Sequence, residues 1–530
     1  MKFITGQDRR QTHIFPVSLE ESIDPDNEVR VIDLFVDSLP LKEFGFDMDF
    51  IENGRPAYHP ADLLKLFIYG YLNKIRSSRD LEKECKRNIE VMWLLKCLQP
   101  DHNTISNFRR DNPRAIKKVF RATVQIAKHF DLIGGKLIAG DSTKLRAQNS
   151  KKNNYNQGKI ERHLAYIENK LAEYSKALQE ADGDNKQQIQ AEIEKQINRK
   201  NQYHKLEKQL DETGEAQIST SDPESRQMII RNSITEVAYN VQTTVDAKHS
   251  LPIDFKVTNN NDSKAMGEML QRATDILGTG RFTALYDKGY HTGSEFKTAQ
   301  ELGVETIVAI PDIPSSNYAP NPAYNVSQFT YDATEDVYIC PQGHKLTTNK
   351  SWYKKSHRNS SVMMRHYKTT ACKSCPVINQ CTKNTRGRGR VIERTEYADY
   401  IEQNRINVQK YEHMYKRRQA IVEHPYGTIK RQWGYSYVIT KRGKDRAAAD
   451  VGFMFIAYNI RRLMNIVLKN DFRNYLKSII FSIFTIFNPD KRKISIFNGT
   501  GFYKVLRCNN FNYRLNSLIF DKILILNGGF

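Results

Sequence analysis

The stretch LIAGDS, residues 137–142, decides the fold of this chain. Its apolar residues form a short run that ends at Asp141, a pattern typical of a buried strand. Three further stretches have the same texture: AYNVQTTVD around Val241, IDFKVT around Phe255, and FTALYD, which ends at Asp287. We therefore expect strands at all four places, with an acid at the end of the first and of the last.

Helices and one more strand follow this series. Asp262 is placed to cap a helix from Ser263 to about Leu277, and Ser294 begins another. The run VETIVAI, residues 304–310, is typical of a buried strand. The order strand, strand, strand, helix, strand, helix, strand predicts an α/β fold with a mixed sheet flanked by helices.

Residues 1–130 have the pattern of a helical domain. Pro60 is placed to open one helix, because its fixed backbone angle suits the first helical position. Ser77 stands three residues before Asp80, as in a capping box, and the helix that it starts is expected to reach about Leu95.

The next stretch, DHNTISNFRR at residues 101–110, combines a helix N-cap with small polar residues and two arginines. Such a helix suits the groove of DNA, as in a helix-turn-helix, and it equally suits the surface of an ordinary helical bundle. Under the first interpretation, Arg109 and Arg110 bind DNA.

Two segments interrupt the strands. Residues 158–235 begin with apolar residues at alternating steps of four and three, followed by the turn DGDN at 182–185 and a second apolar series. This pattern predicts an antiparallel helical hairpin, whose apolar stripe is an internal seam or, alternatively, a partner-binding face. The second segment, residues 315–409, is rich in proline, tyrosine and basic residues.

The second segment also holds four of the seven cysteines: Cys340, Cys372, Cys375 and Cys381. One CxxC pair with two outlying cysteines can supply four thiolates to a structural Zn²⁺ ion, and reduced structural thiols are the alternative. This local cluster differs from the disulfide framework of a secreted protein.

Lys and Arg number 81 against 60 Asp and Glu, a net charge of +21. Such a surplus suits a polyanionic partner, foremost nucleic acid, although a non-specific basic surface would give the same count. The first residues lack a signal peptide, and the longest apolar run, 479–487, is far shorter than the roughly 20 residues that cross a bilayer. We therefore expect a cytoplasmic protein without a membrane partner.

Three acids suit phosphodiester chemistry. Breaking this bond requires an activated nucleophile and a stabilised leaving oxygen, and two divalent ions about 4 Å apart provide both. Hard cations such as Mg²⁺ prefer carboxylates, which Asp141, Asp287 and Glu423 offer. Glu423 lies in a stretch of largely helical composition, and Lys430, seven residues later, falls on nearly the same helical face. Each acid taken alone is also an ordinary turn or surface residue.

Together these stretches resemble the DDE transposases of bacterial insertion sequences. The resemblance rests on LIAGDSTKLRAQNSKKNN at the first acid and ALYDKGYHTGSEF at the second. Around the third acid, Tyr415, Arg418, Glu423 and Lys430 are similar to the family's Tyr, Arg, Glu, Lys signature. The resemblance spans roughly residues 15–465.

The third group departs from the family pattern in two respects. Four residues rather than three separate Arg418 from Glu423, so that Arg417 is an alternative for the arginine of the signature. Pro425 also sits where it removes a helical hydrogen bond, and we expect a helix that is kinked or begins late.

The resemblance implies an RNase H-like catalytic domain over residues 131–465, interrupted by the hairpin and the Cys-containing segment. A helical DNA-binding domain, residues 1–130, precedes it. Residues 466–530 form a tail without a recognisable motif.

The resemblance also implies the activity: metal-dependent cleavage at transposon ends and strand transfer into target DNA. Asp141, Asp287 and Glu423 would hold Mg²⁺ or Mn²⁺. The expected partners are double-stranded terminal repeats and target DNA, bound by a homodimer at the bacterial nucleoid. Two alternatives stay open, namely an RNase H-like nuclease that cannot join DNA and a non-catalytic DNA-binding descendant.

Four more residues take their roles from the resemblance. Lys288, Tyr415, Arg418 and Lys430 would contact DNA, and their phosphate contacts would orient the duplex without reading its sequence.

Overall fold

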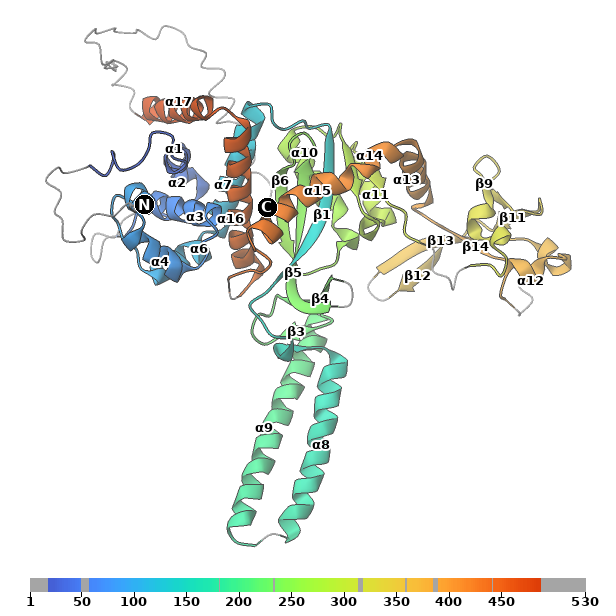
Figure 1. Ribbon diagram of the computed structural model, residues 1–530. Coiled ribbons are helices and arrows are strands. Elements are labelled where there is room, and N and C mark those ends of the chain that lie inside the picture. The colour runs from blue at the N-terminus through green and yellow to red at the C-terminus, as the bar shows by residue number, and fades with distance from the viewer. Residues whose placement is uncertain are drawn as a thin grey trace, which may run out of the picture. The chain divides into compact units, whose positions relative to one another are not determined.

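The computed structural model describes residues 18–48, 57–180, 182–231, 234–312, 318–357, 360–384, 389–440 and 442–487 (Figure 1). The chain divides into two compact units. Unit 1 comprises Met1–Gly134, Ser142–Asn260 and Glu423–Phe530, and unit 2 comprises Gly135–Asp141 and Asn261–Val422.

The N-terminal part of unit 1 is helical, as predicted. Its helices are α1 (Val29–Asp37), α2 (Leu41–Phe44), α3 (Pro60–Leu72), α4 (Ser78–Arg87), α5 (Ile89–Leu94), α6 (His102–Asp111) and α7 (Pro113–His129). Pro60 is the first residue of α3, which confirms its predicted position. The predicted single helix after Ser77 is wrong in its length, because Asn88 ends α4 and its side chain caps α5.

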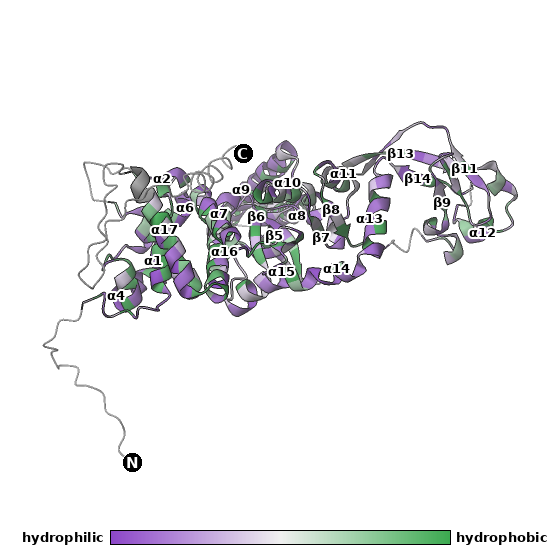
Figure 2. Cartoon of the chain, turned by 90° about the horizontal axis from the view of Figure 1, so that it is seen from above, coloured by the Kyte–Doolittle hydropathy of each residue, from purple (hydrophilic) through white to green (hydrophobic). Residues whose placement is uncertain are grey.

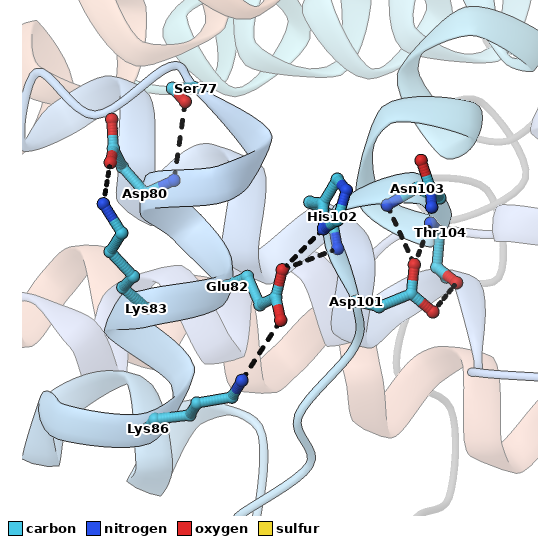
Figure 3. Close-up of polar contacts among 9 residues, drawn as sticks. All are labelled: Ser77, Asp80, Glu82, Lys83, Lys86, Asp101, His102, Asn103 and Thr104. Atoms are coloured by element: carbon cyan, nitrogen blue, oxygen red, sulfur yellow. Dashed lines mark hydrogen bonds and ion pairs between the residues drawn. The ribbon is translucent and has the colours of Figure 1, made fainter.

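Side-chain caps fix the starts of α4 and α6 (Figure 3). The Ser77 hydroxyl accepts a hydrogen bond from the main-chain N–H of Asp80 at 3.4 Å. The Asp101 carboxylate accepts from the main-chain N–H of Thr104 at 2.9 Å, and Glu82 of α4 accepts from that of His102 at 3.1 Å. Both predicted caps are therefore confirmed, and Glu82 ties α4 to α6.

A buried helix organises the core of unit 1. Helix α16 (Lys444–Ile466) packs against α3, α7 and strand β6 (Leu251–Thr258). A Cβ at Gly452 would lie 2.9 Å from the side chain of Ile116, so glycine permits the close approach of α16 to α7. The ring of Phe453 stacks on Phe67 with centroids 4.7 Å apart. Helix α16 is thus apolar on most of its surface, as a fully buried helix must be.

The predicted helical hairpin is present in unit 1. Helix α8 (Gln157–Glu180) packs against α9 (Asp184–Thr213), and short strands β2 (Asn154–Tyr155) and β3 (Ile218–Ser219) pair at its base. The buried residues of the two helices are Ile160, Ile167, Gln196 and Leu210. The apolar stripe is therefore an internal seam between α8 and α9.

The last described helix, α17 (Lys469–Phe487), packs against α1 and includes the apolar run noted in the sequence. Among the residues that the structure describes, no helix is long and apolar enough to span a bilayer.

A six-stranded mixed sheet confirms the predicted α/β fold. Its order is β4 (Arg226–Arg231), β5 (Ile234–Asp246), β1 (Leu137–Arg146), β7 (Thr283–Tyr286) and β8 (Glu305–Val308), with β6 also paired to β5. Strands β4 and β6 are antiparallel to β5, whereas β1, β7 and β8 are mutually parallel. The first strand, β1, lies between the parallel strands β7 and β8 on one side and β5, which pairs with the antiparallel strands β4 and β6, on the other. This is the RNase H-like arrangement.

The first strand is longer than predicted, because β1 does not end at Asp141 but continues to Arg146. Hydrogen bonds from residues distant in sequence sustain this extension. The main-chain N–H of Arg146 donates to Ser436, and that of Ala147 donates to Val237.

Helices α10 (Met266–Leu277), α11 (Gly293–Glu301) and α13 (Ala398–Lys410) belong to unit 2. The side chain of Asn404 on α13 accepts from the main-chain N–H of Val308 at 2.8 Å and donates to its carbonyl at 2.9 Å. This buried amide fixes α13 against β8.

The Cys-containing segment of unit 2 has a sheet of its own. Its strands are β9 (Thr330–Asp332), β10 (Val337–Ile339), β11 (Lys345–Thr348), β12 (Tyr353–His357), β13 (Ser360–Lys368) and β14 (Ile392–Thr395). The order is β12-β13-β11-β10-β9, with β14 also paired to β13. A small core holds these strands together, made of Phe329, Leu346, Tyr367, Cys381 and Ile392.

Candidate active site

The first two predicted acids occupy equivalent positions on neighbouring parallel strands of unit 2. Strands β1 and β7 pair in a register that includes Ala139 opposite Leu285. Asp141 and Asp287 each follow this last pair by two residues, Asp141 within β1 and Asp287 directly after β7. Adjacent strands lie about 4.8 Å apart, and residues in register point to the same face of a sheet. Asp141 and Asp287 therefore lie at the same end of two adjacent strands, and both act electrostatically on Arg418.

Gly140 makes this pairing possible. A Cβ at Gly140 would lie 2.0 Å from a ring carbon of Tyr286, the residue before Asp287. Tyr286 is buried, and its ring packs against Tyr290 with centroids 4.7 Å apart. The glycine before the first acid thus leaves space for the aromatic ring before the second, a relationship that neither stretch of sequence reveals alone.

The turn after the second acid brings a further carboxylate close. Asp287 accepts a hydrogen bond from the main-chain N–H of Gly289 at 2.9 Å. A Cβ at Gly289 would lie 3.0 Å from the Oδ1 atom of Asp287 and 3.9 Å from the Oδ2 atom of Asp262. The prediction that Asp262 caps the following helix is wrong, because a 3-10 turn, Asp262–Lys264, intervenes and Ala265 occupies the N-cap of α10.

Arg418 contacts the first acid. Its Nη1 atom lies 3.3 Å from the Oδ2 atom of Asp141. Burial opposes the charge of Arg418, but Asp141, Tyr415 and Asp287 outweigh this effect and raise its pKa. Arg417 is exposed. The structure therefore brings Arg418, rather than Arg417, to the carboxylates of unit 2.

The third predicted acid lies near the end of helix α15 (Arg418–Tyr426), and Glu423 is the first residue of the last segment of unit 1. Pro425 lies inside α15, and a π-helical turn over Gly427–Gln432 follows directly. The predicted distortion of this helix is thus confirmed. A π-turn has more residues than an α-turn, so the spacing of seven does not by itself keep Lys430 on the face of Glu423.

Lys430 lies beside the second half of β1. Its Nζ atom donates to the hydroxyl of Thr143 at 2.8 Å and to the carbonyl of Lys144 at 3.3 Å. Burial, together with the charges of Lys144 and Arg431, lowers the pKa of Lys430. Three cations of unit 1, Lys144, Lys430 and Arg431, thus lie close enough for the first and last to act on the charge of Lys430.

Of the remaining predicted DNA contacts, Lys288 and Arg110 are on the surface. The Lys288 side chain is 62% exposed and forms an ion pair with Asp312 at 3.0 Å. Arg110 pairs with its neighbour Asp111 at 2.6 Å, and Tyr415 is half-buried.

Arg109 does not fit a role in binding DNA, because it is 4% exposed. It donates to the hydroxyl of Tyr71 at 3.0 Å and to the carbonyl of Arg76 at 3.1 Å, and it lies 3.8 Å from Asp450. Both arginines of the pair were predicted to bind DNA, but α6 places the side chain of Arg109 in the core. Arg109 therefore holds unit 1 together, and we leave it out of the DNA contacts.

The four clustered cysteines line one cavity of unit 2, together with His344 and Arg390. All four are free thiols. Burial raises the pKa of Cys381, and the other three thiols of the cluster contribute to the same shift. The thiols are therefore close enough to affect one another's ionisation. Even so, no three His, Cys, Asp or Glu side chains of the described residues form a group that could hold a metal ion as they stand.

Two family models match the chain. The first, "Transposase domain (DUF772)", covers residues 17–111, and the second, "Transposase DDE domain", covers residues 339–464. The residues that the second model matches include Arg418, Glu423 and Lys430. Residues 17–111 thus match a transposase domain and residues 339–464 match the DDE domain of transposases. DDE transposases cleave and transfer DNA strands, and their catalytic domains use divalent metal ions.

Two solved transposase structures are similar to this chain at low TM-scores. A piggyBac transposase synaptic complex with hairpin DNA gives a TM-score of 0.24 at 9% identity, over 94% of this chain and 84% of that chain. A pre-cleavage Mos1 transpososome gives 0.15 at 14% identity, over 53% and 67%. The fold assignment rests on the strand order instead. No curated protein sequence matches the chain.

Proposed function

We propose that Asp141, Asp287 and Glu423 form the metal-binding triad with which this transposase cuts transposon ends and joins them to target DNA. The observation that supports the proposal is the parallel pairing of β1 and β7, since Asp141 and Asp287 each follow the last residue pair, Ala139 and Leu285, by two positions. Carboxylates are the ligands that Mg²⁺ and Mn²⁺ prefer. When bound, such ions activate a nucleophilic oxygen and stabilise the leaving oxygen.

The chain's own residues supply orientation and charge. Arg418, held 3.3 Å from Asp141, fixes the orientation of that carboxylate and balances its charge. Lys430 and Lys288 offer ammonium groups to the phosphates on either side of the scissile bond. Water would cut at the transposon end, and the freed 3′ hydroxyl would then attack a phosphodiester of the target at the same site.

Double-stranded DNA is the proposed partner, both as terminal repeats and as target. The net charge of +21 supports a polyanionic partner. Two transposon ends must be joined in one reaction, which a homodimer with two equivalent sites accomplishes most simply. We assign residues 1–130 to DNA binding and residues 131–465 to catalysis.

We also propose that Cys340, Cys372, Cys375 and Cys381 bind a structural Zn²⁺ ion. Four free thiols around one cavity have the chemistry of a Cys₄ zinc site, provided that the side chains close around the ion on binding. Elemental analysis of the purified chain should find one zinc per chain, reduced by Cys372→Ser and unchanged by Cys97→Ser. Equal zinc content in both variants would overturn the assignment.

The experiment that separates a transposase from a simple nuclease uses precleaved ends. Donor DNA that already carries a free 3′ hydroxyl is incubated with target plasmid, the chain and Mg²⁺. Joined product is expected. Cleavage of uncut ends without joining of precleaved ends would show a nuclease, and DNA binding without either reaction would show a non-catalytic protein.

A further inference from the structure

Part of the Cys-containing segment, residues 329–395, is strongly basic. Residues 329–395 carry 13 Lys and Arg against 4 Asp and Glu, whereas the whole chain has 81 against 60. Strands β12 and β13 form an antiparallel ribbon at the edge of this sheet (Figure 1). Figure 2 shows β13 as largely hydrophilic.

The ribbon exposes two large aromatic side chains. Trp352 and Tyr353 are each 41% exposed. Trp352 directly precedes β12, and Tyr353 is its first residue. Their partners on β13, Arg365 and His366, are consecutive strand residues and so point to opposite faces of the ribbon. The guanidinium of Arg365 lies 4.3 Å from the centre of the Trp352 ring, and His366 stacks on Tyr353 at 4.7 Å between ring centroids. Each face therefore presents an aromatic ring held in place by a basic side chain.

Most lysines around the ribbon lack an acidic partner. Lys345 pairs with Glu335, and Lys355 pairs with Glu393 at 2.6 Å. Within the described residues, the other five lysines of the segment form no ion pair: Lys350, Lys354, Lys368, Lys373 and Lys383. A surface with this much unbalanced positive charge attracts a polyanion.

We propose that the β12–β13 ribbon is a DNA-binding surface separate from the triad. A two-stranded antiparallel ribbon has the size that the major groove of duplex DNA admits. The unpaired lysines would contact phosphates on both sides of the groove, and the rings of Trp352 and Tyr353 would pack against sugars and base edges. The inference rests on the proposed function only in taking DNA as the substrate.

The test measures binding of the full chain to duplex DNA of random sequence and to duplex DNA carrying the element's ends. Trp352→Ala/Tyr353→Ala should weaken binding about tenfold, a change of about 1.4 kcal/mol. Lys354→Gln/Lys368→Gln should reduce the slope of log K against log salt by about 2, since each phosphate contact contributes roughly 0.9. Tyr166→Ala is the matched control, because Tyr166 is an exposed aromatic residue, 52% accessible, on α8.

Thermal unfolding of every variant shows whether the fold is kept. If the aromatic variant unfolds, the salt dependence of DNA binding by the lysine variant still tests the proposal, because that variant removes no packed side chain. If the folded ribbon variants bind DNA with wild-type affinity and an unchanged salt slope, the inference is overturned. This result would not bear on the proposed triad. Stronger loss with single-stranded than with duplex DNA would also overturn it, in favour of a single-strand site. A wild-type chain that binds duplex DNA through the ribbon but neither cuts nor joins would instead refute the proposed function.

Discussion

The guanidinium of Arg418 lies 3.3 Å from the carboxylate of Asp141, although 276 residues of sequence lie between them. The family spacing left Arg417 and Arg418 as alternatives, and the structure places Arg418 at the acid. This contact joins the first acid of the proposed triad to the helix that carries the third.

Removal of this arginine should impair joining without abolishing DNA binding. We expect Arg418→Ala to lower the rate of strand transfer about a hundredfold, as loss of one positioned donor at a charged site typically does. Arg417→Ala is the matched control and should leave the rate close to that of the wild type. Single-turnover kinetics with saturating DNA measure both. Equal rates for the two variants would show that Arg418 has no part in the reaction.

Gly140→Ala should destabilise the sheet, because the new methyl group would overlap the ring of Tyr286. Overpacking of this kind costs about 1 to 3 kcal/mol of unfolding free energy. Denaturant unfolding should show this loss, and Gly140→Ala/Tyr286→Leu should recover part of it. Gly158→Ala is the control, since a Cβ at Gly158 meets nothing within 4 Å. Equal stability of Gly140→Ala and Gly158→Ala would contradict the packing described here.

The two neighbouring arginines of α6 should separate stability from DNA binding. Arg109→Ala leaves Asp450 without one of its buried partners, and the unfolding free energy should fall by about 3 kcal/mol. Arg110→Ala should leave stability unchanged and lower the salt slope of DNA binding by about 1. Urea unfolding and binding titrations across salt concentrations measure the two effects. A stable Arg109→Ala variant with weakened DNA binding would instead support the prediction from the sequence that Arg109 binds DNA.

The lowered pKa of Lys430 should appear in the pH dependence of joining. A lysine with a lowered pKa is charged below that pKa and loses its proton as the pH rises through it, at a lower pH than an ordinary lysine. Its attraction for a phosphate therefore fades first on the alkaline side. Lys430→Arg keeps its charge there, and its joining activity should extend to higher pH.

The control for this profile is Lys288→Arg, which alters an exposed lysine of unit 2. Single-turnover rates of joining are measured across the alkaline pH range for wild type, Lys430→Arg and Lys288→Arg. An identical alkaline decline in wild type and Lys430→Arg would mean that another group limits the reaction.

Sequence patterns predicted the parts of the fold that depend on local periodicity. The strand that ends before Asp287, the cap at Asp101 and the hairpin of α8 and α9 all follow from residues within a few positions of each other. The alternating apolar steps were enough to predict both the helices and their pairing.

The features that the sequence did not predict depend on partners far along the chain. Strand β1 passes Asp141 because Ser436 and Val237 bind its continuation. Arg109 is buried because α6 presents it to Tyr71. The place of Asp262 near Asp287 depends on how the 3-10 turn packs, and no pattern within its own segment encodes that contact.

Metal-dependent strand transfer by separate variants of the triad tests the central claim most directly. Asp141→Ala, Asp287→Ala and Glu423→Ala are compared with wild type and with Glu301→Ala, an exposed acid of α11, on DNA carrying the element's own ends with Mg²⁺. Joining should disappear in all three triad variants while DNA binding persists, and Glu301→Ala should join DNA as the wild type does. Normal joining by any one triad variant would contradict the assignment of that acid.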